Sequence, residues 1–380
     1  MSKEAKSKDF TQFDLMFFMI VMLLLTVGLI MMFSASHPDA LNRYDDSLHY
    51  IKRQGPFAVL GVIMMLGISK INYRILEKLA IPIMIVTAAF LVAVLVLPPL
   101  SPEFDYKRWF YIPGFKSFTF QPSELAKFMI VVVFSKYIVK FYNVMKTFTF
   151  GVLPFMGILG VTCGLVMLEK HLSGTIIIAC IGIVLLIVGG TRFKWLALLG
   201  SVGAAAVGTY MVFSGKFEHA LQRIEFYWDP WKDPNDKGWQ IIQALYAIGS
   251  GGLMGQGVGH SKQKFLYVSE PQNDCIFAIV CEELGFIGAV VIIALFCLLI
   301  WRGFAIAMRA PDRFGCLLAV GLTFQVGLQA ALNIMVVTKV IPNTGISLPF
   351  FSYGGSSLLM LMMQMGVILS ISRQSSLQRR

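Results

Sequence analysis

Long apolar stretches alternate with polar segments along the whole chain. Windows of about 18 or more apolar residues are typical of transmembrane helices, and such windows recur from one end of the sequence to the other. The pattern predicts ten spans, at about residues 15–36, 55–69, 79–97, 122–140, 151–168, 172–189, 195–213, 275–301, 314–337 and 358–372. We therefore expect an all-α polytopic membrane protein.

The polar segments between these spans are short, with one exception. Residues 214–274 form the longest, and we predict a large extracellular loop there, with short helices at about 217–227 and 239–248. Residues 98–122 are expected to form a smaller loop, and residues 1–12 and 373–380 to form polar tails. Because no polar stretch is long enough for a separate soluble domain, we expect one membrane domain over residues 1–380.

The distribution of basic residues predicts the orientation. Lys and Arg are more frequent on the side of the two termini than in the short loops on the opposite side. Since short cytoplasmic loops carry an excess of Lys and Arg, we expect a cytoplasmic-membrane protein with both termini in the cytoplasm. The net charge of +11 then reflects this bias and contact with anionic membrane lipids, and it requires no nucleic-acid partner.

Composition agrees with this class and excludes two kinds of stabilising site. The chain is 57% hydrophobic and only 14% charged. Its six cysteines lie in or beside apolar spans, with no C-x-x-C spacing. They are expected to be free thiols packed as small apolar residues, rather than disulfides or zinc ligands.

The unusual polar residues gather on the predicted outer side of the membrane. They are Arg108, Trp109, Glu124, Lys127, His171, Ser173, Arg223 and the stretches 262–274 and 333–357. A transporter typically places its charged groups near the bilayer midplane, at broken helices. The one-sided arrangement instead favours a site that acts on a headgroup at the outer leaflet.

Asp274 lies at the mouth of the predicted eighth span, after a glycine-rich stretch at residues 249–259. An ionisable residue at the edge of the hydrocarbon is costly unless it is solvated, paired or used, so a functional role is one interpretation. The other is an N-cap for a helix that begins near Cys275, since aspartate is a favoured N-cap residue. The glycine-rich stretch could hold phosphate through its backbone N–H groups.

Five segments resemble the SEDS family, whose members include FtsW, RodA and SpoVE. They read RWF…FQPSELAK at residues 108–127, HLSGT at 171–175, GWQIIQ within 223–243, QKFLYVSEPQNDCIFAIVCEELGFIG at 263–288 and NTGISLPFFSYGGSS at 343–357. The segments follow in the family's order over about the whole chain, with a spacing closest to the FtsW and SpoVE branch.

The resemblance implies a peptidoglycan glycosyltransferase that polymerises lipid II, a lipid-linked disaccharide, at the outer membrane face during division, elongation or sporulation. The family's essential aspartate falls on Asp274, which is expected to act as general base on the acceptor hydroxyl. The diphosphate leaving group needs stabilising cations, for which the candidates are Arg108, Lys127, Arg223, Lys262 and Lys264. Each is alternatively a basic residue whose side chain extends to the membrane interface.

Four charged residues are expected to support the site. Lys127 follows Glu124 by three residues, so the two are predicted to pair on one face of a helix. Glu282 and Glu283 would lie about 12 Å deeper along a helix than Asp274. We therefore expect one or both of these glutamates to be paired inside the bundle.

Small residues near the C-terminus offer two interpretations. Ser352, Gly354 and Gly355 belong to the run SYGGSS. Such residues either let membrane helices approach closely or line the groove for the lipid.

The chain departs from the family pattern at two places near the predicted site. Cys275 follows the aspartate where phenylalanine is usual, and Glu169, Lys170 and His171 replace the common Gln-Pro-Asp. We expect His171 to be a polar helix-end residue rather than a base.

Two other function classes stay open. A lipid II flippase would need a polar path through the bilayer, and a non-catalytic scaffold of the cell-wall synthesis complex would not need Asp274. The resemblance further implies a partner, a class B penicillin-binding protein with transpeptidase activity. A divalent cation, Mg²⁺ or Mn²⁺, could assist the diphosphate, but no carboxylate cluster in the sequence specifies one.

Overall fold

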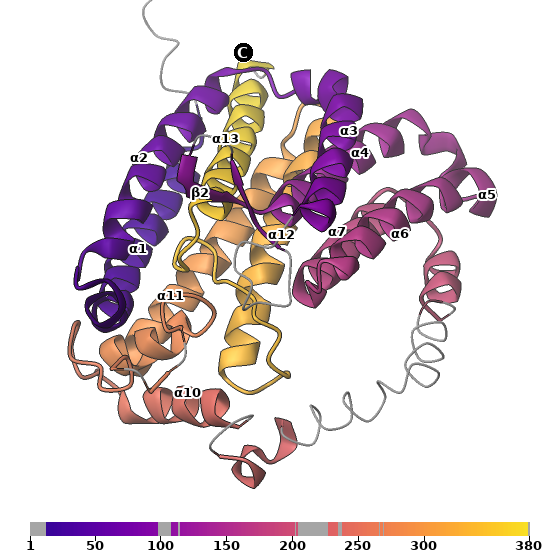
Figure 1. Cartoon of the computed structure of the whole chain (residues 1–380). Helices are drawn as coiled ribbons and strands as arrows, with labels where there is room; N and C mark the ends of the chain where they lie inside the picture. The colour runs from indigo at the N-terminus through magenta and orange to yellow at the C-terminus, as the bar shows by residue number, and fades with distance from the viewer. Residues whose placement is uncertain are drawn as a thin grey trace, which may run out of the picture.

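The computed structural model describes residues 13–97, 108–112, 115–201, 203, 227–234, 238–265, 267–268 and 270–378. These residues form a bundle of long helices (Figure 1). Arg223 and almost all of the predicted helix at 217–227 lie outside the described residues. The predicted seventh span is helical at residues 193–201, and almost all of its remainder also lies outside them.

Nine helices of the described part correspond to nine of the ten predicted spans. They are α1 (Leu15–Tyr44), α2 (His49–Lys70), α3 (Ile75–Val96), α4 (Pro122–Lys140), α6 (Leu153–Leu168), α7 (Leu172–Val188), α11 (Ile276–Met308), α12 (Arg313–Val337) and α13 (Gly355–Gln378). Six of them are long and apolar enough to cross a membrane: α1, α2, α3, α11, α12 and α13. α2 begins several residues earlier than predicted, because its first turns are polar and escape a search for apolar windows.

Short elements occupy the connections. α5 (Phe148–Gly151) and two 3-10 turns (Tyr142–Val144 and Pro230–Lys232) are brief, and α10 (Trp239–Ser250) is the amphipathic helix predicted at about 239–248. α10 lies across one end of the bundle, opposite the C-terminus (Figure 1). β1 (Phe110–Ile112) and β2 (Phe115–Phe120) pair as an antiparallel hairpin, so the prediction of an irregular loop there was wrong. The sequence carries a hairpin signal, a Pro-Gly pair between aromatic-rich runs.

The bundle is organised around α4, α12 and α13. α13 packs along α2, α11 packs against α12, and α4 contacts α3, α7 and α12. Nearly continuous runs of α4 and α12 are buried, including residues 129–135 and 317–323. A helix that is apolar all round is one that other protein segments surround, and these helices form the interior wall on which the polar site described below is built.

α11 is interrupted at Gly285, whose backbone has φ 68° and ψ −172°. A break of this kind frees carbonyl and N–H groups, which must find partners inside a membrane protein. The glycine-rich loop supplies them through four bonds: Gln256 N to Glu282 O (2.9 Å), Gly257 N to Glu283 O (3.0 Å), Phe286 N to Gly252 O (2.9 Å) and Ile287 N to Leu253 O (3.2 Å).

This pairing explains the glycines of the loop. A Cβ atom on Gly251 would lie 2.0 Å from the Cys281 carbonyl oxygen, and one on Gly255 would lie 2.2 Å from that of Glu283. The backbone approaches too closely for any larger residue. The N–H groups of Gln256 and Gly257 are bonded to protein carbonyls, so the interpretation of this loop as a phosphate cradle was wrong for them.

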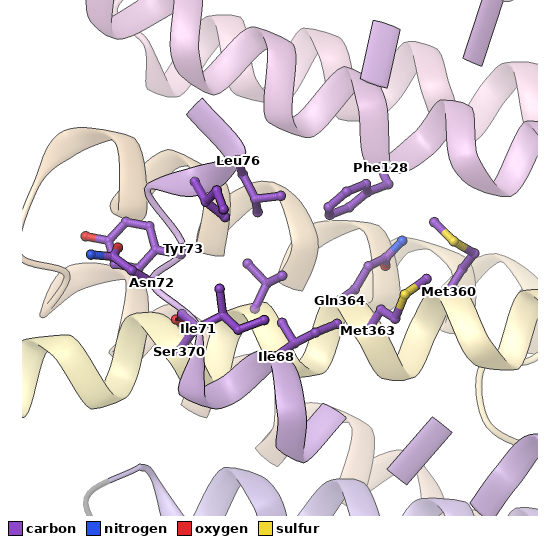
Figure 2. A pocket seen from close by; sticks show the side chains of 12 residues that line it. Ile68, Ile71, Asn72, Tyr73, Leu76, Phe128, Met360, Met363, Gln364 and Ser370 are labelled. Carbon is purple, nitrogen blue, oxygen red and sulfur yellow. Dashed lines mark hydrogen bonds between the residues drawn. The ribbon is translucent and has the colours of Figure 1, made fainter. Parts of the chain in front are cut away.

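An apolar cavity of about 200 Å³ lies beside the turn between α2 and α3 (Figure 2). α4 and α13 complete its walls through Phe128, Met360, Met363 and Gln364. No Asp, Glu, Lys or Arg is among the described residues that line it. It therefore lacks the groups that charged or acid-base chemistry requires.

Candidate functional site

A polar cavity of about 330 Å³ lies at the end of the bundle where several helices begin. Its wall contains most of the outer-side polar residues that the sequence singled out: Arg108, Trp109, Glu124, Lys127, His171, Ser173, Asp274, Gly345, Ile346, Ser347, Gly354, Ser356 and Ser357. Segments far apart in the sequence thus meet at one place, which confirms that these polar groups converge.

Four helix N-termini face this cavity. Its lining includes residues at the start of α4, α7 and α13, and the residues directly before α11. Each N-terminus carries partial positive charge and N–H groups without a partner in the helix. Their convergence makes the cavity favourable for an anion such as phosphate.

Asp274 lies just before the first turn of α11. The N-cap is Cys275, without a side-chain cap bond, and the helix begins at Ile276. The alternative of Asp274 as an N-cap was therefore wrong. Its partly buried side chain lines the cavity, and burial, partly offset by nearby backbone N–H groups, raises the pKa of Asp274 to about 6. A carboxylate with a pKa close to the working pH is suited to take up a proton.

The backbone around Asp274 is held by side chains from α12 and from the loop before α13. The amide of Asn333 donates to the carbonyl oxygens of Asp274 (2.8 Å) and Ile346 (2.6 Å). The hydroxyl of Ser352 donates to the carbonyl oxygen of Asn273 (2.6 Å). The amide and the hydroxyl fix the height of Asp274 relative to the loop that forms the opposite wall.

Lys127 is buried and lines the cavity. Its Nζ lies 2.8 Å from the carboxylate of Glu124, so the predicted pair is confirmed, and it also donates to Gln329 Oε1 at 3.0 Å. Gln329 is a site residue that the sequence analysis missed, because an isolated glutamine within an apolar span carries no motif. The three side chains form a buried polar cluster below Asp274's cavity wall.

Arg108 reaches the cavity from the strand side. Its Nη2 donates to the carbonyl oxygen of Lys170 at 2.6 Å, where Lys170 has a positive φ of 58°. The neighbouring Glu169 is fully buried, and this burial, opposed by the charge of Arg108, raises the pKa of Glu169 to about 8. The guanidinium therefore sits over the turn between α6 and α7, at the rim of the cavity.

The two loop lysines lie away from this cavity. Lys264 is buried, and its Nζ contacts the carboxylate of Glu283 at 2.9 Å and the hydroxyl of Ser34 at 3.2 Å. Lys262 has an exposed side chain, and its backbone N–H donates to Glu282 Oε1 at 2.8 Å. The expectation that one or both glutamates are paired inside the bundle is confirmed. These residues brace the break in α11, and neither lysine is among the residues that line the cavity.

The small residues of the SYGGSS run divide between both interpretations. Gly355 lies against the ring of Phe57, where a Cβ atom would come within 2.6 Å, so it lets α13 approach α2. Gly354 lines the cavity and donates its N–H to Gln54 Oε1 at 3.2 Å.

Metal ligands are sparse at this site. Among the described residues no group of three or more His, Cys, Asp or Glu side chains could hold a metal ion. The carboxylates on the cavity wall are Glu124, Glu270 and Asp274, and the first is already paired with Lys127. The protein alone therefore does not form a complete cation site in this part of the chain.

The bundle and its polar cavity define a multi-pass membrane protein with a ligand site where four helices begin. Residues 14–377 match the family model for FtsW, RodA and SpoVE, described as cell cycle proteins, and the chain belongs to this family. It is 42% identical over 368 residues to stage V sporulation protein E of Bacillus subtilis strain 168, covering 95% of this chain and 97% of that protein. It is 36% identical over 360 residues to a probable peptidoglycan glycosyltransferase FtsW of Geobacter sp. strain M18, covering 95% of this chain and 96% of that protein.

Solved structures share the fold. A chain from a peptidoglycan synthase complex that coordinates polymerization and crosslinking superposes with a TM-score of 0.77, at 24% identity, covering 96% of this chain and 98% of that one. RodA of Thermus thermophilus superposes with a TM-score of 0.66, also at 24% identity, covering 95% of this chain and 97% of that one. The predicted fold class is therefore confirmed.

Proposed function

We propose that this chain is a peptidoglycan glycosyltransferase that polymerises lipid II into glycan strands at the outer face of the cytoplasmic membrane. The observation that carries the proposal is the polar cavity, in which a carboxylate with a raised pKa, two cations and four helix N-termini meet. Relatives that share about a third or more of its residues are described as peptidoglycan glycosyltransferases or as a sporulation protein.

The proposed chemistry follows from these groups. Asp274, deprotonated, takes the proton of the acceptor sugar hydroxyl as its oxygen attacks the anomeric carbon of the donor sugar. The bond from that carbon to the diphosphate oxygen breaks, and its electron pair leaves with the lipid diphosphate. Lys127, Arg108 and the helix N-termini stabilise the negative charge that develops there.

A single general base is sufficient for this reaction. The leaving group is a diphosphate, which departs without a proton when its charge is stabilised, so no second carboxylic acid is required. Lys127 supplies a point charge, whereas Arg108 can present a planar fork to phosphate oxygens. A divalent cation is part of the proposal only as an ion brought by the diphosphate, because Mg²⁺ is typically held by one or two carboxylates and substrate phosphates.

Orientation and partnership belong to the same proposal. Both termini are placed in the cytoplasm by the bias of Lys and Arg, so the cavity faces outward, where lipid-linked sugars are used. We propose a class B penicillin-binding protein as the partner that crosslinks the new strands. The support is that a chain of the same fold belongs to a complex that coordinates polymerization and crosslinking.

The test is glycan-strand formation from purified lipid II, with the chain alone and with its transpeptidase. The parent is compared with Asp274→Asn, whose fold is checked by its melting temperature. Polymer from the parent and none from the folded variant is the expected result. Polymer from both would move the base to another residue.

The other function classes give different results in the same reconstituted system. If neither protein makes polymer with partner and substrate verified, the proposed activity is wrong. Transbilayer movement of labelled lipid II in vesicles would then indicate a flippase, and its absence a scaffold.

A further inference from the structure

His171 occupies a position in the cavity that its sequence context did not predict. It precedes the first residue of α7, is 8% exposed and lines the same cavity as Asp274. Its side chain makes no cap bond to the helix. The simple role of a polar helix-end residue therefore does not explain why the imidazole is here.

The ring is held in one orientation by two neighbours. Nδ1 lies 3.1 Å from the hydroxyl oxygen of Ser123 in α4. On the other side the ring packs over Gly174, where a Cβ atom would lie 2.6 Å from Nδ1. A larger residue at 174 would displace the imidazole, so the sequence leaves this space for it.

The surroundings of Ser123 determine which ring nitrogen carries the proton. Ser123 is fully buried, and its contact with His171 is the one hydrogen bond that its hydroxyl makes among the described residues. If Nδ1 carried the proton, the hydroxyl hydrogen would be buried without an acceptor, which is costly. The hydroxyl therefore donates to Nδ1, and the hydrogen of the neutral ring is on Nε2.

The ring is neutral at the pH of the cell. Burial, together with the charges of Arg108 and Lys127, lowers the pKa of His171 to about 3. No described residue bonds Nε2, although the residue lines the polar cavity. The result is an uncharged N–H donor that the protein itself does not use.

We propose that His171 binds the lipid-linked substrate directly, by donating Nε2–H to an oxygen of its sugar-diphosphate headgroup. This inference rests on the proposed function, because it assigns a contact of the same site. The placement supports it: Ser173, two residues on, donates its hydroxyl to the carbonyl of Thr344, and the Cβ position of the next residue, Gly345, is 3.7 Å from Asp274 Oδ2. The start of α7 and the proposed base are thus tied to one loop.

Two substitutions separate a substrate contact from a tether to Ser123. In His171→Gln the amide nitrogen reaches about as far as Nε2, so the cavity donor is kept and the bond to Ser123 is lost. In His171→Asn the amide reaches only as far as Nδ1, so the bond to Ser123 is kept and the cavity donor is lost. The two variants are matched, since each removes one of the two contacts.

Affinity for lipid II is measured with each variant combined with Asp274→Asn, so that substrate is not consumed and the result does not depend on catalysis. We expect His171→Asn to weaken binding roughly five- to tenfold, the loss of about one hydrogen bond, and His171→Gln to stay within about twofold. The melting temperature is expected to show the opposite order, with His171→Gln the lower.

Equal affinity of His171→Asn and the His171 protein would overturn the inference. So would the reverse order, with His171→Gln the weaker binder, because it would leave only the tether to Ser123. Absence of any lipid II binding by the Asp274→Asn protein that retains His171 would also overturn it. Failure of the parent to polymerise, with binding still weakened by His171→Asn, would refute the proposed activity and leave the contact standing.

Discussion

Replacement of Lys264 by Met should destabilise the protein strongly, although the residue lies away from the cavity. Lys264 and Glu283 are 3% and 1% exposed, and their charged atoms are 2.9 Å apart. At that distance and an effective dielectric constant of about 20, their attraction is about 6 kcal/mol, much of which offsets the cost of removing both charges from water. Removing one partner leaves the other charge buried alone, which typically costs about 3–5 kcal/mol.

The double variant Lys264→Met/Glu283→Met is the control for this reasoning. Replacing both charges by apolar side chains of similar volume is often nearly neutral, so we expect it to recover most of the loss. Only the hydroxyl of Ser34, which contacts Glu283 at 2.7 Å, then loses its partner, at a cost of about 1–3 kcal/mol.

The assay is unfolding in mixed detergent micelles, followed for the parent, the two single variants and the double variant, which together form a mutant cycle. A loss below about 1 kcal/mol for Lys264→Met would refute the estimate. A double variant that loses the sum of the two single losses would refute the coupling. The same double variant should bind lipid II like the parent, because Lys264 braces α11 and does not line the cavity.

Two further predictions concern the base and the glycine-rich loop. Because Asp274 acts in its deprotonated form and its pKa is raised to about 6, kcat/KM for polymerisation should fall as the pH drops through about 6; an acid limb near pH 4, the usual range of aspartate, would contradict the role of burial. Gly251→Ala, whose Cβ atom would lie 2.0 Å from the Cys281 carbonyl oxygen, should lower the folded yield and melting temperature sharply, whereas Gly249→Ala in α10, with nothing within 4 Å, should be neutral or stabilise by up to about 1 kcal/mol. Equal behaviour of the two alanine variants would show that the loop does not pack against α11 as described.

The helices could be predicted from the sequence because membrane spans are specified by local composition. Apolar windows located nine described helices, and errors arose at polar ends such as the first turns of α2, which lie outside any apolar window. The break at Gly285 was not predicted, since one glycine inside an apolar run is compatible with a continuous helix. Its stabilising partners, residues 252–257, are supplied by a separate loop.

The site could be predicted only in part, for a similar reason. Motif residues such as Asp274, Lys127 and Arg108 could be assigned because the family's pattern marks them. Gln329 and His171 could not, since their roles depend on which side chains the fold places beside them. Lys264 shows the converse, because a lysine near the proposed base in sequence is directed by tertiary contacts to a buried glutamate instead.

The break in α11 mechanically isolates the proposed base from the lipid bilayer. The segment before Gly285 carries Asp274 at its start and is fastened to the glycine-rich loop at its end, whereas the segment after it has exposed apolar side chains such as Phe286, Val290 and Val291. Helices adapt to bilayer thickness by tilting, and at a break only the outlying segment needs to tilt. We therefore expect the rate of polymerisation to vary little with the acyl chain length of the surrounding lipid, even where the protein's orientation in the membrane adjusts.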